Sequence, residues 1–389
     1  MIVKTNIRVL LWAPFGAGDH YWGPGTSAFR LYSNKDKHDG LELDLLHSSK
    51  KQNIFSKVYS NQFYIEGLEG RNFLSKIKFI LKSLIWISKN HKNYDVVHGL
   101  SAYYYTFFPL IFFSMLKVKT VIKITGSNSG LINQSFFSNL LGLTFIRKKT
   151  LNKISAFVCI SDEIEKNILL NNVSVNKIFK LPNGVDINKF NKIDNKKIIR
   201  ETLNLKNVFT ILFVGGLTEN KRILETTIAI KELIDVGYNI QFLIVGPDRS
   251  SGIIENKIKK IICNYDSIKL IPHTNKPELY YQLANAFILA SKKEGMSNAL
   301  LEAMSSSLSV LCTNISGSSD LIQDGYNGIF IKSGSVFDIK KSIIYIYENK
   351  HISKVFGVNA RNTIIKNYSS DRIYKKHFEL FNKLIVNGN

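Results

Sequence analysis

The chain has 389 residues, more than a single compact core usually holds, so its length predicts two domains. An apolar content of 45% excludes long disorder, and 7 prolines with 24 glycines exclude a repetitive fibre. The formal net charge of +22 favours an anionic partner such as a nucleic acid, an acidic membrane or a phosphorylated substrate, although a plain lysine-rich surface would give the same charge. Three widely spaced cysteines predict neither a disulfide framework nor a zinc site, which fits a reducing cytoplasm.

Short apolar runs alternate with longer helical patterns along the whole chain, as in βαβ units with parallel sheets. The first half offers six strand-like runs, at residues 7–13, 41–47, 96–98, 120–125, 156–160 and 178–181. The second half offers six more, at residues 210–214, 241–245, 267–271, 286–290, 309–312 and 328–331. Six strands per half is the number that a doubly wound domain uses, so the predicted fold class is α/β with two Rossmann-like domains.

The domain boundaries are predicted from composition. Residues 186–207 are polar and rich in Lys and Asn, so we expect them to link an N-terminal domain, residues 1–185, to a C-terminal domain, residues 208–365. The last segment, residues 366–389, contains an amphipathic helix pattern. We expect this helix to pack back on the N-terminal domain.

Two hydrophobic segments admit more than one interpretation. Residues 99–116 contain no charged side chain, but Pro109 and three consecutive tyrosines favour a buried helix over a membrane span. Residues 73–89 form an amphipathic helix pattern, which either covers the core or lies on an anionic membrane. Its apolar face comprises Phe73, Ile77, Ile80, Leu81, Leu84 and Ile87, and its lysines are Lys78, Lys82 and Lys89.

The most specific motif combines two glutamates with a loop that opens a helix. Glu294 and Glu302 are separated by seven residues and follow the predicted strand at 286–290. Backbone N–H groups at the start of such a helix, at residues 296–298, can hold a diphosphate. Glu294 precedes the helix, where a sugar hydroxyl could lie, and Glu302 is two turns in, within reach of a second polyol such as ribose.

Several motifs resemble those of retaining glycosyltransferase family 4, the glycosyl transferases group 1, and they follow the family's order along residues 7–386. They are Asp95-Val96-Val97-His98, Ile160-Ser161-Asp162-Glu163, Leu181-Pro182-Asn183-Gly184-Val185-Asp186, Phe213-Val214-Gly215-Gly216-Leu217 with Lys221, and Glu294 with Glu302-Ala303-Met304. The resemblance implies the glycosyltransferase-B fold, in which two Rossmann-like domains face each other across a cleft. It implies that the N-terminal domain binds the acceptor and the C-terminal domain the nucleotide-sugar.

The resemblance also implies roles for single residues. Lys221 would neutralise the donor diphosphate, Glu294 would contact the donor sugar, and Glu302 would hold the ribose. His98 would contact the transferred sugar or the acceptor. Further donor contacts are expected from Gly216, Arg222, Gly295, Met296, Ser297 and Asn298, and from Gly23 and Gly25 before the first helix, where Gly16 and Gly18 could serve instead.

The sequence departs from the family pattern at several positions. The family has an arginine where this chain has Gly216, so a diphosphate-binding cation is missing there, and Arg222 is the nearest candidate to compensate. The family's Gly and Pro after the glutamate motif are Ser307 and Ser309. Because of these changes, the sequence is also compatible with a weakly active or non-catalytic relative of the family. The turn at 246–248 is interpreted as a simple connection between a strand and a helix.

The sequence therefore predicts a hexosyltransferase-type enzyme, a retaining glycosyltransferase that moves a sugar from a nucleotide-sugar, with UDP the expected nucleotide. The expected acceptor is a saccharide or polyprenyl-linked glycan of bacterial lipopolysaccharide, O-antigen or capsule. No Asp-X-Asp and no metal-spaced cluster occurs, so neither a metal nor a cofactor is expected. The expected location is the cytoplasm, with peripheral attachment to the plasma membrane and no nucleic-acid partner. The alternatives are a nucleotide-sugar epimerase and a non-catalytic basic scaffold protein.

Overall fold

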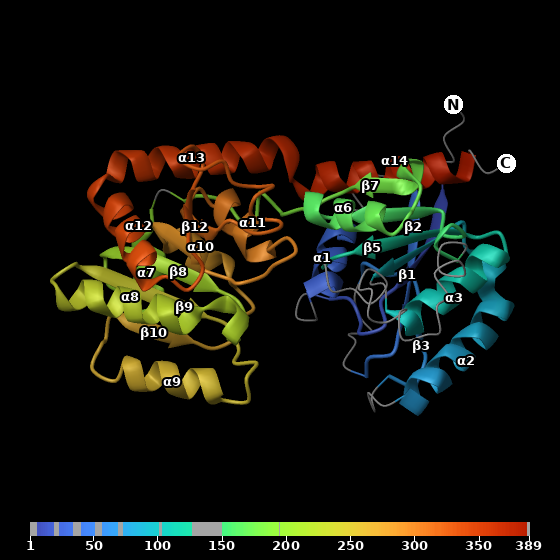
Figure 1. Cartoon of the computed structure of the whole chain (residues 1–389), viewed down its shortest axis with the longest axis horizontal. Helices are drawn as coiled ribbons and strands as arrows, with labels where there is room; N and C mark the ends of the chain where they lie inside the picture. The colour runs from blue at the N-terminus through green and yellow to red at the C-terminus, as the bar shows by residue number, and fades with distance from the viewer. Residues whose placement is uncertain are drawn as a thin grey trace. The chain divides into compact units, whose positions relative to one another are not determined.

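The structure is a computed structural model that describes residues 6–18, 23–33, 40–50, 57–68, 73–100, 103–126, 150–193 and 195–386. The chain divides into two compact units (Figure 1). Unit 1 comprises residues 1–184 and 370–389, whereas unit 2 comprises residues 185–369. Each unit is therefore an α/β body of its own, and the chain enters unit 1 twice.

Unit 1 is built on a parallel sheet of seven strands in the order β3-β2-β1-β4-β5-β6-β7. The strands are β1 (Ile7–Trp12), β2 (Leu41–His47), β3 (Gln62–Tyr64), β4 (Val96–Leu100), β5 (Lys119–Ile124), β6 (Ala156–Cys159) and β7 (Ile178–Lys180). The α-helices within the described residues of unit 1 are α1 (Gly23–Tyr32), α2 (Phe73–Asn90), α3 (Tyr104–Met115), α6 (Asp162–Leu170) and α14 (Ser370–Val386). The order runs outward in both directions from β1 and β4, which is the doubly wound arrangement that the strand pattern predicts.

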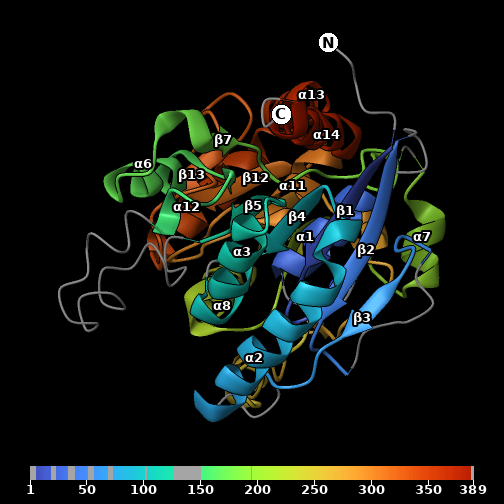
Figure 2. The ribbon, with the colours of Figure 1, turned by 90° about the vertical axis from the view of Figure 1, so that its right-hand side faces the viewer.

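Side chains of β1 alternate between two helix layers, because successive residues of a strand point to opposite faces. Leu11 belongs to a buried cluster that includes Ile373 of α14. Trp12 faces the other side, where its ring packs edge-on against Phe79 of α2 and Phe113 of α3, with centroids 6.1 Å apart in both pairs. Figure 2 shows α2 and α3 side by side over the strands.

The helix α14 completes the core of unit 1. In the sequence it is separated from the rest of this unit by all the residues of unit 2. Ile373 and Phe381 are fully buried. Tyr374 packs edge-on against Tyr32 of α1, with ring centroids 6.5 Å apart. The last helix therefore supplies apolar surface that α1 and the sheet would otherwise expose.

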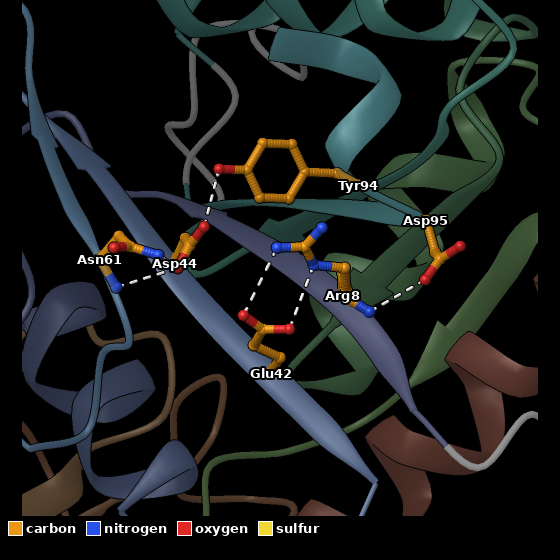
Figure 3. A network of polar contacts seen from close by, with 6 residues as sticks. All are labelled: Arg8, Glu42, Asp44, Asn61, Tyr94 and Asp95. Atoms are coloured by element: carbon orange, nitrogen blue, oxygen red, sulfur yellow. Dashed lines mark hydrogen bonds and ion pairs between the residues drawn. The ribbon is translucent and has the colours of Figure 1, made fainter.

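A polar network joins β1 to its neighbours in unit 1 (Figure 3). The backbone N–H of Arg8 donates to Asp95 at 2.9 Å, and the guanidinium of Arg8 pairs with Glu42 of β2 at 3.1 Å. Asp44 accepts a hydrogen bond from the hydroxyl of Tyr94 at 2.8 Å. Burial, and then this bond to a carboxylate, raises the pKa of Tyr94 well above its ordinary value. The network links β1, β2 and the turn before β4, which supports their register.

Unit 2 contains a parallel sheet of six strands in the order β10-β9-β8-β11-β12-β13. The strands are β8 (Phe209–Val214), β9 (Ile240–Val245), β10 (Ile268–Ile271), β11 (Ala286–Leu289), β12 (Ser309–Thr313) and β13 (Ile329–Ile331). The α-helices are α7 (Lys197–Thr202), α8 (Ile223–Asp235), α9 (Ile253–Ile261), α10 (Glu278–Leu283), α11 (Asn298–Ser305), α12 (Val336–Glu348) and α13 (Lys350–Asn367). The strand order again runs outward from a central pair, here β8 and β11, so unit 2 is doubly wound as well.

The segment predicted as a linker, residues 186–207, is folded into unit 2. Phe190 is 1% exposed and packs edge-on against Tyr281 of α10, with ring centroids 5.5 Å apart. Arg200 of α7 is 5% exposed. The polar composition of the segment suggested a solvated connector, but a few anchoring side chains suffice to hold it against the unit.

The helix α2 has two apolar faces rather than the single one that the sequence pattern suggested. Phe79 and Ile87 are buried against the unit, together with Ser83. A second row lies in solvent, where the exposed fractions are 74% for Leu74, 56% for Leu81 and 59% for Ile85. Phe73 and Ile77, which belong to the predicted apolar face, are exposed as well.

The uncharged segment 99–116 contains the end of β4 and the helix α3, which has only 12 residues. Phe107, Leu110 and Phe113 of α3 are buried. This agrees with the prediction of a buried helix. Within the described ranges, no helix combines the length and apolar character needed to cross a membrane.

Candidate functional site

The candidate site of unit 2 lies where loops leave the carboxyl ends of β8, β9 and β11, which is where doubly wound sheets gather ligands. Two glycines allow these loops to touch. Gly246, after β9, has a φ of 140°, and a β-carbon there would overlap the backbone of Gly215 after β8. Gly317, after β12, has a φ of 78°, and a β-carbon there would overlap the carbonyl of Gly295. Glycine is therefore required at both positions.

Lys221 and Glu294, which the sequence predicted in one site, form an ion pair. Lys221 ends the short 3-10 helix η4 (Glu219–Lys221), and Glu294 lies in the loop between β11 and α11. The neighbouring Asn220 clamps that loop, because its side chain donates to the carbonyl of Lys293 and its carbonyl accepts from the N–H of Lys292, both at 2.7 Å. The side chains of the pair are 19% and 16% exposed, so a ligand could still reach them.

The helix α11 follows directly. Ser297 is its N-cap, and its hydroxyl accepts a hydrogen bond from the N–H of Leu300 at 3.4 Å. The first turn carries no acidic residue, so the positive end of the helix dipole is not neutralised by a side chain of that turn. Glu302, two turns in, is 4% exposed. Gly295, Met296, Ser297 and Asn298 connect Glu294 to this helix start, as the sequence predicted.

An arginine that sequence reasoning missed lies beside Gly216. A β-carbon on Gly216 would be 2.7 Å from Cδ and 2.9 Å from Nε of Arg249. The two loops are bonded together, because Leu217 donates to the carbonyl of Pro247 at 2.9 Å and Arg249 donates to the carbonyl of Leu217 at 3.1 Å. The stem of Arg249 therefore occupies the space that any side chain at Gly216 would need.

Arg249 is exposed, and its guanidinium has no hydrogen-bond or ion-pair partner in the described part of the chain. The preceding Asp248 instead accepts from the N–H and hydroxyl of Ser250 and, at 2.8 Å, from the N–H of Glu255 in α9. The turn at 246–248 therefore does connect a strand to a helix, as predicted, but it also presents a cation. The signal in the sequence was an arginine directly after the turn at residues 246–248.

Arg222, the predicted substitute for the missing cation, is engaged elsewhere. It has a left-handed backbone with a φ of 53°, and its guanidinium pairs with Glu225 of α8 at 2.8 Å. Arg222 lines a small pocket of about 210 Å³ with Thr218 and Glu219. A role in donor binding stays a prediction for this residue.

His98 of unit 1 lies in the interior rather than at a ligand-accessible edge. It is 0% exposed, and its Nδ1 is 2.6 Å from the hydroxyl of Tyr32. Its ring packs against His377 and Phe381 of α14, with centroid distances of 5.7 and 5.8 Å. Burial lowers the pKa of His98 well below its ordinary value. The structure thus gives His98 a packing position instead of the predicted contact with sugar or acceptor.

The two glycines predicted to precede the first helix lie instead in its first turn. Gly23 is the first residue of α1, and a β-carbon there would meet no described atom within 4 Å. Gly25, two residues further on, is buried. Their contact with phosphates stays a prediction, as does independence from metals. In the described ranges no group of His, Cys, Asp and Glu side chains is arranged to hold a metal ion.

Known glycosyltransferases are similar in sequence to this chain. Residues 194–363 match the family model of the glycosyl transferases group 1. The capsular polysaccharide biosynthesis glycosyltransferase CapM of Staphylococcus aureus is 26% identical over 234 residues, which are 59% of this chain and 61% of that protein. The UDP-Gal:alpha-D-GlcNAc-diphosphoundecaprenol alpha-1,3-galactosyltransferase of Escherichia coli is 28% identical over 59% of this chain and 60% of that protein. The match thus spans about three fifths of the length of these two relatives.

Solved structures share the fold over nearly the whole chain. A glycosyltransferase from Rickettsia africae superposes with a TM-score of 0.78 at 17% identity, covering 98% of this chain and 99% of that one. Anabaena HepE, solved in complex with UDP and glucose, superposes with a TM-score of 0.76 at 13% identity, covering 96% of this chain and 99% of that one. Residues 194–363 are therefore similar to the glycosyl transferases group 1, and the chain has the glycosyltransferase-B fold of two parallel α/β units.

Proposed function

We propose that this protein is a retaining glycosyltransferase that moves a sugar from a UDP-sugar to a saccharide or polyprenyl-linked acceptor in bacterial surface-polysaccharide synthesis. The observation that carries the proposal is the Lys221–Glu294 ion pair at the loop that opens α11. A cation and an uncompensated helix start suit a diphosphate, while a carboxylate suits sugar hydroxyls. The proposal is supported by the named acceptor and donor of the Escherichia coli relative and by the UDP in the HepE complex.

The proposed chemistry needs no covalent intermediate on the protein. The bond between the sugar C1 and the diphosphate oxygen breaks, and the acceptor oxygen forms its bond to C1 on the same face. The departing diphosphate takes the proton of the acceptor hydroxyl. Lys221 and Arg249 would neutralise the charge that develops on the diphosphate, and Glu294 would orient the sugar. Glu302, buried two turns into α11, would hold the ribose.

Calorimetric titration with UDP, GDP and their common sugars tests the donor site. We expect one nucleotide to bind selectively and Lys221→Ala to weaken that binding by about tenfold or more, because a charge-assisted hydrogen bond to phosphate is lost. Lys340→Ala is the matched control, since Lys340 also pairs with a glutamate of unit 2, Glu232. Absence of nucleotide binding by the wild-type protein would overturn the proposal and favour a scaffold role.

The second part of the proposal is attachment to an anionic membrane through α2. Leu74, Leu81 and Ile85 form a solvent-exposed apolar row on this helix. Lys78 and Lys82 lie on the same helix and pair with Glu66 at 3.6 and 2.7 Å. An apolar row beside lysines is the pattern of helices that lie in the plane of an anionic bilayer.

Sedimentation with vesicles tests this attachment. We expect binding to vesicles that contain phosphatidylglycerol, and its loss in Leu81→Glu/Ile85→Glu. The control is Leu169→Glu/Leu170→Glu, which adds the same charge at an exposed apolar site on α6. Equal sedimentation of both double variants would exclude α2 as the docking element.

A further inference from the structure

A second pocket of unit 2 lies at the opposite, amino-terminal end of the sheet. Its volume is about 570 Å³. It is lined at the starts of strands by Phe209, which opens β8, by Asn285 before β11 and by Leu308 before β12. Its remaining walls come mainly from α7 and the segment before it, from the turn after α11, from the end of α12 and from the beginning of α13. The pocket is therefore separate from the loops that carry Lys221 and Glu294.

Five cationic side chains line this pocket, and they are Lys192, Lys196, Arg200, Lys350 and Lys354. The described residues that line it include no aspartate and no glutamate. Lysines scattered over a basic surface would be unremarkable, but convergence of five on one cavity is unfavourable unless an anion is present. This charge imbalance is the first sign of a ligand.

Two of the five cations, the buried Arg200 and the half-buried Lys196, have no carboxylate partner among the described residues. Arg200 is 5% exposed, and its guanidinium donates to the carbonyls of Leu283 at 3.0 Å and Val208 at 3.4 Å, while its Nε has no partner. Lys196 donates to the carbonyl of Ala284 at 2.6 Å. Carbonyl oxygens satisfy these donors but do not neutralise their charge, and buried charges are normally paired.

Repulsion within the cluster acts on Lys196, its half-buried lysine. Burial, and then the nearby charges of Arg200 and Lys192, lower the pKa of the Lys196 ammonium to about 8. An anion in the pocket would relieve this repulsion and restore the charged form of Lys196. The direction of the shift therefore agrees with a site that is completed by negative charge.

The helix α13 adds to the same effect. Its N-cap, Asn349, makes no side-chain capping bond, and its first turn contains no acidic residue. Lys350 and Lys354 instead lie at this positive end of an 18-residue helix, which is an unfavourable place for cations. Their position becomes favourable when an anion lies between them and the helix end.

We infer that this pocket binds a phosphate-bearing anion, held by Lys192, Lys350 and Lys354 around the buried Arg200. Phosphate is favoured over a carboxylate, because several lysines and a helix end converge from different walls and match its multiple charged oxygens. The volume is that of a small-molecule site and admits a phosphate with a sugar-sized group attached. The source is either a soluble phosphorylated compound or the headgroup of an anionic lipid. The inference does not depend on the proposed glycosyl transfer.

Lysine labelling read by mass spectrometry tests the site residue by residue, and it separates this pocket from the Lys221 region. Reductive methylation of the full chain is followed with and without inorganic phosphate, against chloride at equal ionic strength. At a phosphate concentration ten times the dissociation constant, we expect labelling of Lys350 and Lys354 to slow by about tenfold, in proportion to the free fraction. Lys257 and Lys260, exposed on α9, should be labelled at an unchanged rate.

Substitution shows whether the protection comes from one built site. In Lys350→Ala/Lys354→Ala we expect phosphate to protect Lys192 no longer, whereas Lys257→Ala/Lys260→Ala, with the same loss of charge, should leave protection of Lys192 intact. Vesicles of phosphatidylglycerol replace phosphate in a second arm, with phosphatidylcholine as the neutral reference. Protection by free phosphate assigns a soluble ligand, and protection by phosphatidylglycerol alone assigns a lipid headgroup. No protection by either, or equal protection of Lys257 and Lys260, would overturn the inference.

Discussion

Arg249 fills the place that a side chain at Gly216 would take, with its Cδ 2.7 Å from where the β-carbon of residue 216 would be. On the adjacent residue, a β-carbon at Gly215 would lie 3.8 Å from Cε of Lys221. Two neighbouring glycines are thus flanked by two cations from different loops. A cation supplied from the loop after β9 can serve a diphosphate as well as one supplied at residue 216.

The first prediction moves the arginine between these loops. We expect Arg249→Ala to weaken UDP binding by about tenfold, the effect of one lost hydrogen bond to a charged group. The double variant Arg249→Ala/Gly216→Arg should recover most of that affinity, because the space left by Arg249 accepts the new stem. Isothermal titration with UDP gives both values. Unchanged affinity in Arg249→Ala would show that this guanidinium does not reach the nucleotide, while wild-type binding separately tests the donor site.

The second prediction separates the two partners of the ion pair. Glu294→Gln frees Lys221, so we expect UDP to bind with unchanged or higher affinity. Sugar transfer should fall by about a hundredfold or more, since the group that orients the sugar is lost. The control is Glu232→Gln, which removes the carboxylate of the comparable pair with Lys340. A parallel loss of UDP affinity and turnover would contradict the assignment of Glu294 to the sugar.

The third prediction concerns Gly317, which contacts the backbone of the loop before α11 at Gly295. Gly317 and Gly325 have similar positive φ values, 78° and 71°, but only Gly317 touches other backbone. We expect Gly325→Ala to destabilise unit 2 by about 1 kcal/mol through backbone strain alone. Gly317→Ala should cost more and abolish nucleotide binding, because it displaces Gly295. Hydrogen exchange of residues 286–305 should rise in Gly317→Ala and stay unchanged in Gly325→Ala.

The fourth prediction is a pH dependence of unit 1. Burial lowers the pKa of His98 well below its ordinary value. Burial and the nearby charge of Lys123 lower the pKa of His377 to about 3. The rings stay neutral when folded but take up protons near pH 6.5 when unfolded. Stability is therefore fully present above pH 6.5 and decreases below it, by up to about 1.4 kcal/mol per pH unit for each ring.

Urea unfolding followed by tryptophan fluorescence measures this slope, since all three tryptophans lie in unit 1. His377→Leu should lose roughly half of the decrease in unfolding free energy between about pH 7 and about pH 5. His351→Leu, at an exposed position of unit 2, is the control. An unaltered slope in His377→Leu would mean that His377 does not carry the dependence.

The sheets could be predicted from sequence because parallel strands buried on both faces are continuous apolar runs. All six runs of each half are strands in the structure, and the three-residue strand β3 was missed. The chain segment that leads into α7 could not be predicted as packed, because its few anchors, Phe190 and Arg200, are hidden in a polar composition. Local patterns report average polarity and not which single residues are buried.

The candidate site was predictable where one local motif carries it and unpredictable where two loops meet. Glu294, the start of α11 and Glu302 are close in sequence, so their arrangement follows from one loop and one helix. The proximity of Arg249 to Gly216 depends on the crossing of two loops 33 residues apart, which no spacing reveals. His98 was misplaced for a related reason, since the helix that encloses it, α14, is the last in the described chain.

That enclosure by α14 has a consequence for biosynthesis. On a ribosome, residues 185–369 emerge and can fold before residues 370–386 exist, so unit 2 can reach its native state first although it is encoded second. Until then, the apolar surface of unit 1 that Ile373 and Phe381 later cover stays exposed to solvent. During translation the unit that begins the chain is therefore the one that finishes folding last.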